Sequence, residues 1–180
     1  MERPKRKTNR LKGYDYSQTG GYFITICVKN KENILWSNIG GSLSNEKSIL
    51  SDIGSLVNMA IKNIPHIYDG VSVDKYVIMP NHVHLILILP GKVTKGTTSP
   101  SISTIIGQLK RYVTRQVGYP IWQKLFYDRV IRNEMDYKSY WQYIDENPLK
   151  WKDDEYYCRG AYNGSPMKVS VKNMQEGRDG

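Results

Sequence analysis

Cysteine is scarce in this chain, and no hydrophobic run is long. The two cysteines, Cys27 and Cys158, show no paired-motif spacing, and no apolar run follows the basic N-terminus as a secretory signal would require. The longest apolar stretch, Val83 to Leu89, is far too short to cross a bilayer. We therefore expect a soluble, cytoplasmic protein.

The length of 180 residues suits one domain with a full hydrophobic core, and no internal repeat divides it. Basic residues crowd the start of the chain, whereas the part beyond Trp151 is rich in Asp, Gly and Ser. We predict a basic arm over residues 1–20, a single domain over 21–160 and a loosely ordered tail over 161–180.

Positive charge dominates, with 26 Lys and Arg against 17 Asp and Glu, a net charge of +9 and a pI near 9.4. This balance favours a polyanionic partner, for which nucleic acid is the obvious candidate. The first twelve residues hold one acid and six bases, namely Arg3, Lys5, Arg6, Lys7, Arg10 and Lys12. We interpret them as a flexible arm that binds phosphates in a salt-dependent way; the alternative is a solvated tail.

The most informative motif is Pro80-Asn81-His82-Val83-His84, which runs directly into an apolar stretch. On a strand, His82 and His84 point to the same face, because strand side chains alternate sides. Each buried imidazole needs a partner, since an unpaired buried polar group costs roughly 1–3 kcal/mol. The pair therefore has the geometry of half a metal site. In the alternative interpretation, one ring binds a backbone carbonyl and the other reaches solvent.

A second polar pair follows about sixty residues later, on a predicted helix that Asn133 caps and Pro148 ends. Tyr143 and Asn147 lie one turn apart on this helix, where a hydroxyl and an amide oxygen can reach a shared ligand. They border an apolar stripe made of Tyr137, Tyr140, Trp141 and Ile144. Because the chain has fourteen tyrosines, chance spacing is the competing interpretation.

Together the two motifs resemble those of single-tyrosine transposases with a His-hydrophobic-His motif, and most closely those of the REP-associated tyrosine transposases. The resemblance runs from Tyr22 to about Trp151. Its landmarks are Tyr22-Phe23-Ile24-Thr25, Val77 to Leu85, Ile121-Trp122-Gln123 through Asp128 to Ile131-Arg132, and Tyr143-Ile144 with Asn147-Pro148. Asn147 stands where related insertion-sequence enzymes usually have Gln, which favours the REP-associated branch.

The resemblance implies a DNA transposase and endonuclease that cleaves and rejoins single-stranded DNA at hairpin sequences. In that family a divalent cation, Mg²⁺ or Mn²⁺, polarises the scissile phosphate; carried over, its ligands are His82, His84 and Asn147. The nucleophile would be Tyr143, which forms a 5′-phosphotyrosine link and releases a 3′-hydroxyl; Tyr140, one turn away, is the alternative. Nearby metal and basic side chains are expected to favour the phenolate.

Basic and aromatic residues that lie close together in sequence predict further DNA contacts, because unpaired bases stack on aromatic rings. Trp122, Tyr127 and Tyr112 stand near such bases. The predicted DNA-binding residues are Arg3, Lys5, Arg6, Lys7, Lys110, Arg111, Arg115, Trp122, Lys124, Arg129 and Arg132. A solvated helix face is the competing interpretation for residues 110–115. We expect a single-stranded or hairpin DNA partner at the nucleoid, no membrane, and a monomer rather than a homodimer that exchanges the tyrosine helix.

Hydrophobic periodicity predicts the element order strand, helix, strand, strand, helix, strand, helix. The predicted strands are 21–29, 71–79, 82–89 and 127–132, and the predicted helices are 45–64, 101–117 and one between Asn133 and Pro148. This order indicates an α+β fold, a ferredoxin-like sandwich with a mainly antiparallel central sheet and helices packed on it. The two strands joined at Pro80-Asn81 are expected to be antiparallel neighbours near the sheet centre, and Pro65 is expected to end the first helix.

Two other functions remain open. A metal-dependent phosphodiester hydrolase would use His82 and His84 to activate water and would not need the hydroxyl of Tyr143. A non-catalytic module that binds single-stranded or hairpin DNA would bind without strand scission.

Overall fold

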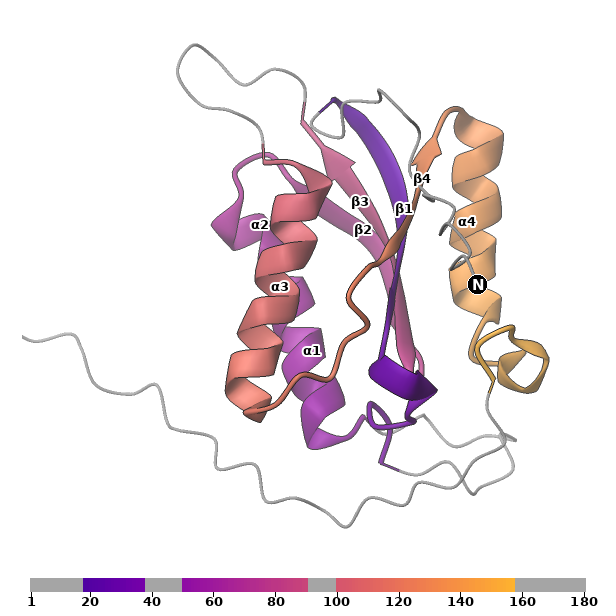
Figure 1. Ribbon diagram of the computed structural model, residues 1–180. Helices are drawn as coiled ribbons and strands as arrows, with labels where there is room; N and C mark the ends of the chain where they lie inside the picture. Colours follow the sequence, from indigo (N-terminus) through magenta and orange to yellow (C-terminus); the bar gives the residue numbers. More distant parts are fainter. Residues whose placement is uncertain (1–17, 38–49, 91–99, 158–180) are drawn as a thin grey trace, which may run out of the picture.

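The computed structural model describes residues 18–37, 50–90 and 100–157. Its centre is a four-stranded antiparallel sheet in the order β2-β3-β1-β4. The strands are β1 (Gly20–Cys27), β2 (Ser72–Ile78), β3 (His82–Leu89) and β4 (Tyr127–Ile131). Helices pack on both faces of the sheet (Figure 1), which confirms the predicted α+β, ferredoxin-like sandwich. The predicted tail over 161–180 and most of the basic arm lie outside the described residues.

One face of the sheet is covered by α1 (Asp52–Lys62), α2 (Ile64–Ile67) and α3 (Ile102–Val117) (Figure 1). Alternate residues of β3 point into this layer and are fully buried, namely Val83, Leu85, Leu87 and Leu89. Ser101 caps α3 by accepting a hydrogen bond from the amide of Thr104, and Gly118 ends the helix with a φ of 88°. A left-handed residue at this position suits glycine, which has no Cβ to clash.

The opposite face carries α4 (Glu134–Glu146), the one α-helix on that side among the residues that the structure describes (Figure 1). Asn133 caps α4 as predicted, since its side-chain oxygen accepts a hydrogen bond from the amide of Asp136. A second buried cluster of Phe23, Ile86 and Ile144 joins the helix to the sheet. The predicted stripe packs against this cluster through Tyr137, Tyr140 and Trp141.

Two local predictions are wrong. The first helix does not run to Ile64 and stop at Pro65: α1 ends at Lys62, and Pro65 lies in the first turn of the separate short helix α2, where its missing N–H has no intrahelical partner to lose. The predicted start of the first helix is also too early, because Leu50 and Ser51 precede α1, which begins at Asp52 with Ser51 as its cap; residues 45–49 lie outside the described residues. In addition, β2 and β3 are antiparallel neighbours as expected, but β2 does not lie near the sheet centre. It is an edge strand, because β1 rather than β2 pairs with both β3 and β4. Within the described residues, no helix is long and apolar enough to span a bilayer.

Candidate active site

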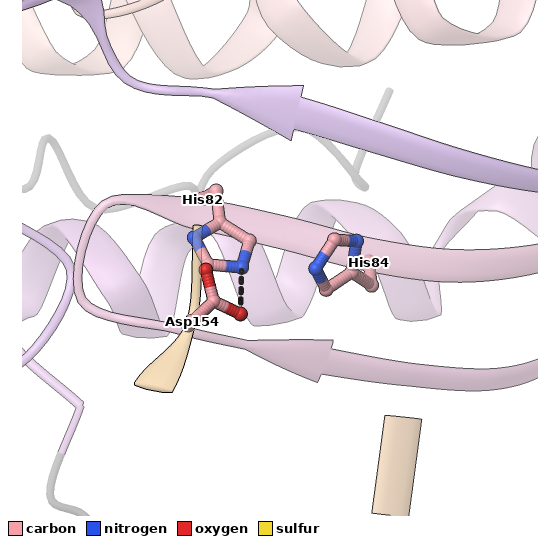
Figure 2. A group of neighbouring side chains, drawn as sticks. All are labelled: His82, His84 and Asp154. Carbon is pink, nitrogen blue, oxygen red and sulfur yellow. Dashed lines mark ion pairs between the residues drawn. The ribbon is translucent and has the colours of Figure 1, made fainter. Parts of the chain in front are cut away.

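His82 and His84 leave β3 on the face that α4 covers, as their spacing predicts. Both rings are buried, at 0% and 1% exposed, and their centroids are 4.5 Å apart. Figure 2 shows the two rings side by side on the same strand. The alternative in which one ring reaches solvent is therefore wrong.

Each imidazole is oriented by a hydrogen bond at Nδ1. Nδ1 of His84 lies 2.8 Å from the hydroxyl oxygen of Thr25, its cross-strand neighbour on β1. Nδ1 of His82 lies 2.9 Å from the side-chain oxygen of Asn81, the residue before it in the motif. Because Nδ1 is used in both rings, Nε2 is the nitrogen that can bind a ligand. Nε2 of His82 is buried with no hydrogen-bond partner among the described residues.

The two rings are neutral over most of the pH range. Burial lowers the pKa of His82 to about 3, and the nearby charge of Lys31 lowers it further. Burial also lowers the pKa of His84 to about 3, with a contribution from His82. Neutral imidazole is the form that binds a metal ion, so the environment keeps both side chains in the state that a cation needs.

A third side chain, that of Asp154, lies beside the two histidines. The sequence motifs did not predict this residue. Its side chain is 2% exposed, and one carboxylate oxygen lies 4.0 Å from Nε2 of His82, as the dashed line in Figure 2 marks. The ligand atoms of His82, His84 and Asp154 lie within 4.8 Å of one another, so the cluster can hold a metal ion. The available signal was the acidic run Asp153-Asp154-Glu155 in a chain of net charge +9.

Asp154 reaches the site from η2 (Trp151–Asp153), the single turn that follows α4. The carboxylate accepts hydrogen bonds from the side-chain amide of Asn147 at 3.0 Å and from the backbone amide of Tyr156 at 2.7 Å. The side chain of Asn81 also donates to the backbone oxygen of Tyr156, at 2.9 Å. The segment after α4 is therefore bound to the histidine motif.

Asn147, the third predicted ligand, lies at the C-terminal cap of α4 and is 4% exposed. Its amide nitrogen is used by Asp154, but its side-chain oxygen is buried without a hydrogen-bond partner among the described residues. A buried carbonyl oxygen without a donor is costly unless something positive binds it. Two neutral imidazoles, one carboxylate and one amide oxygen fit a divalent cation.

Tyr143 lies one turn before Asn147, and its hydroxyl is 3.5 Å from Nε2 of His84. The residue is 39% exposed and lines a cleft that it shares with His84. Burial and the charges of Asp154 and Glu155 raise its pKa to about 12. The expectation that basic side chains favour its phenolate is therefore wrong: the charged groups that act on it are acidic.

The residues predicted to bind DNA are scattered over the molecule. Arg129, on β4, lines the same cleft as His84 and Tyr143. Arg111 and Arg115 are exposed on α3, across the sheet from α4 (Figure 1). Lys124 and Arg132 are exposed before and after β4, and Arg3, Lys5, Arg6 and Lys7 lie outside the described residues.

Two of the predicted DNA contacts have structural roles. Trp122 is only 7% exposed and belongs to the main core, so its ring offers no face to a base. The ammonium group of Lys110 donates to the backbone oxygens of Gln123, Lys124 and Leu125, at 2.6, 3.2 and 3.5 Å. Lys110 therefore fastens the segment before β4 to α3.

Comparison with known proteins gives several relatives, although no family profile matches the chain. An uncharacterised protein of Haemophilus influenzae is 35% identical over 84% of this chain and 93% of that protein. The REP-associated tyrosine transposase of Escherichia coli is 33% identical over 43% of this chain and 44% of that protein. A solved structure of a REP-associated tyrosine transposase bound to a REP hairpin shares the fold, with a TM-score of 0.58 and 23% identity over 84% of this chain and 74% of the other.

Proposed function

The chain belongs to the REP-associated tyrosine transposases, and from this premise we propose that it cleaves and rejoins single-stranded DNA at REP-like hairpins. The proposed reaction passes through a 5′-phosphotyrosine intermediate and uses a divalent metal. The observation that carries the proposal is the position of the Tyr143 hydroxyl, 3.5 Å from Nε2 of His84 at the edge of the His82, His84 and Asp154 cluster.

The metal would be held by His82, His84, Asp154 and Asn147. The unpartnered Nε2 of His82 and side-chain oxygen of Asn147 support this set. A divalent ion such as Mg²⁺ or Mn²⁺ would supply Lewis-acid polarisation of the scissile phosphate there. Its positive charge would also offset the acidic charge that, together with burial, raises the pKa of Tyr143. Asp154 adds a negative charge that the three-ligand set inferred from the sequence lacked.

Thr25 and Asn81 act as positioning residues in this proposal. Their hydrogen bonds occupy Nδ1 of both imidazoles, so each ring presents Nε2 to the site. Such second partners fix the tautomer and the direction of a ligand ring.

Tyr143 is the proposed nucleophile. Its oxygen forms a bond to phosphorus while the bond between phosphorus and the 3′-oxygen breaks; the hydroxyl loses a proton and the departing 3′-oxygen gains one. The phosphotyrosine retains the energy of the phosphodiester, so a 3′-hydroxyl can later displace the tyrosine and rejoin the strand. Tyr140 is less suitable, because its ring is stacked on Phe23 at 4.5 Å.

We also propose that one chain forms a complete site. Tyr143 meets His84 of its own chain, so the site needs no tyrosine helix from a second copy. Adduct formation per mole of protein should then be independent of protein concentration. A rate that rises with concentration would indicate that two chains share the site.

The test is incubation with labelled single-stranded hairpin DNA carrying a set of flanking sequences, with Mn²⁺ or with EDTA, followed by a denaturing gel. We expect a protein–DNA adduct that requires the metal and disappears in Tyr143→Phe. Tyr140→Phe is the matched control, because it removes a hydroxyl one turn away on the same helix.

Each other outcome identifies a different function or nucleophile. Cleavage that survives Tyr143→Phe without an adduct would support a hydrolase that activates water. If the adduct disappears in Tyr140→Phe but persists in Tyr143→Phe, the nucleophile is Tyr140. Hairpin binding without scission over the whole flank set would support a binding module.

A further inference from the structure

A cleft of about 710 Å³ opens beside the proposed reaction centre, between α4 and the strands β1 and β4. Its lining includes Thr25, His84, Tyr127, Arg129, Tyr140 and Tyr143. Ligand pockets typically occupy roughly 300–1,000 Å³, so the cleft is large enough for a small molecule or for part of a polymer. Because it contains both His84 and Tyr143, its occupant would lie next to the reacting phosphate.

The strand register builds the floor of this cleft. Thr25 pairs with His84 on one side and with Tyr127 on the other, so one row of side chains leads from the histidine to the sheet edge. In the next row, Phe23 pairs with Arg129. Side chains of paired residues lie on the same face, which places Tyr127 and Arg129 on the face that carries His84.

Tyr127 is 42% exposed although it stands on a strand face that elsewhere packs under α4. A tyrosine in this position offers an open ring at the edge of the sheet, one strand away from Thr25 and two from His84. Aromatic rings on such surfaces hold unpaired bases by stacking, with little dependence on which base is present. A base could therefore stack on the ring of Tyr127 while the phosphate of the same nucleotide lies beside His82 and His84.

The charges of the cleft suit a whole nucleotide better than a phosphate alone. Arg129 and Lys31 line it together with the acid Glu155 and the buried acid Asp128. Guanidinium and ammonium groups donate to phosphates and to base oxygens, whereas a carboxylate accepts from base amino groups and repels phosphate. In a cleft that bound only the phosphate backbone of DNA, a carboxylate would weaken binding by repelling the phosphate.

We propose that this cleft binds the unpaired base that flanks the scissile phosphate, with Tyr127 as the stacking residue and Arg129 as a donor to the same nucleotide. The inference rests on the proposed function for the position of the phosphate. It adds a determinant for the single-stranded flank, which is distinct from recognition of the paired hairpin.

The test measures stacking directly, in the Tyr143→Phe background so that the DNA stays intact. Hairpin DNA carries the fluorescent base 2-aminopurine immediately before or immediately after the cleavage site, and its quenching on binding is recorded. We expect strong quenching at one of the two positions. Tyr127→Ala should abolish most of it and weaken binding about 5- to 150-fold, whereas Tyr127→Phe should retain both.

Tyr112→Ala is the matched control, because Tyr112 is 40% exposed and lies on α3, across the sheet from the cleft. It should leave quenching unchanged. Absence of quenching at both positions, or equal quenching in Tyr127→Ala, would overturn the inference even if wild-type protein forms the tyrosine adduct. If quenching depends on Tyr127 but no adduct forms, the cleft binds a base as inferred. That result would contradict the proposed cleavage reaction instead.

Discussion

Phe23 and Tyr140 stack face to face between β1 and α4, with ring centroids 4.5 Å apart and ring planes 9° from parallel. Two further ring contacts of Phe23 are with the site itself: its ring stacks on His84 at 5.3 Å and meets Tyr143 edge-on at 5.9 Å. One phenylalanine thus contacts both the strand that carries the histidines and the helix that carries the proposed nucleophile. Its size sets the spacing between them.

Phe23→Leu should therefore slow adduct formation more than it destabilises the fold. A hydrophobic replacement of similar volume typically costs under about 1.5 kcal/mol, whereas Phe23→Ala should cost about 3–5 kcal/mol. Urea unfolding and the rate of adduct formation in saturating metal measure the two effects separately. Ile88→Val, a small change at a partly buried residue packed on the same cluster, is the control. A wild-type rate in Phe23→Leu would show that ring stacking does not hold Tyr143 in place.

Metal binding should be measurable without DNA. We expect Mn²⁺ to raise the melting temperature of the wild-type protein, since an ion at 100 times its dissociation constant stabilises the folded state by about 2.7 kcal/mol. Asp154→Asn should reduce the shift strongly, because it removes the only charged ligand. Asp153→Asn changes the exposed neighbouring acid and should preserve the shift. Equal shifts in the two variants would exclude Asp154 as a ligand.

Acid should destabilise the metal-free protein through the buried histidines. Folding lowers the pKa of His82 and of His84 from 6.5 to about 3. Between pH 6.5 and pH 3 the two histidines are therefore protonated in the unfolded chain but neutral in the folded protein. The free energy of unfolding should accordingly fall as the pH drops from 6.5 toward 3, and this contribution should be flat above 6.5. Urea midpoints across this range should show a shallower slope in His84→Gln than in wild type. His66→Gln, which alters an exposed histidine on α2, should keep the wild-type slope.

Lys110 and Arg111 are neighbours on α3 with different expected roles. Lys110→Met should cost about 1–3 kcal/mol of stability, because it leaves backbone oxygens of the 123–125 segment without their charged donor. Arg111→Met should change stability by less than about 0.5 kcal/mol, since this side chain is exposed. If Arg111 contacts DNA as predicted, its loss should also lower the salt dependence of hairpin binding. Equal stability of the two variants would show that the hydrogen bonds from Lys110 to the 123–125 segment do not stabilise the fold.

Elements with strong local signals were predictable. The strand from His82 to Leu89, the helix capped by Asn133 and the helix that Gly118 ends all have the predicted positions to within a residue or two. Hydrophobic periodicity, caps and breakers act over a few residues, so they can be read along the chain. The split of the first helix at Asn63 was missed because Pro65 can begin a helix as well as end one.

The sequence by itself determined the class of fold, the shared face of His82 and His84, and the spacing that puts Tyr143 and Asn147 on one turn of a helix. Only the tertiary structure decided that Asp154 joins the histidines, that Trp122 is buried, and that Tyr127 and Arg129 line the cleft beside Tyr143. The physical reason is the range of the interactions. Periodicity and capping depend on neighbours along the chain, whereas these contacts depend on strand register and on how the segment after α4 returns to the sheet.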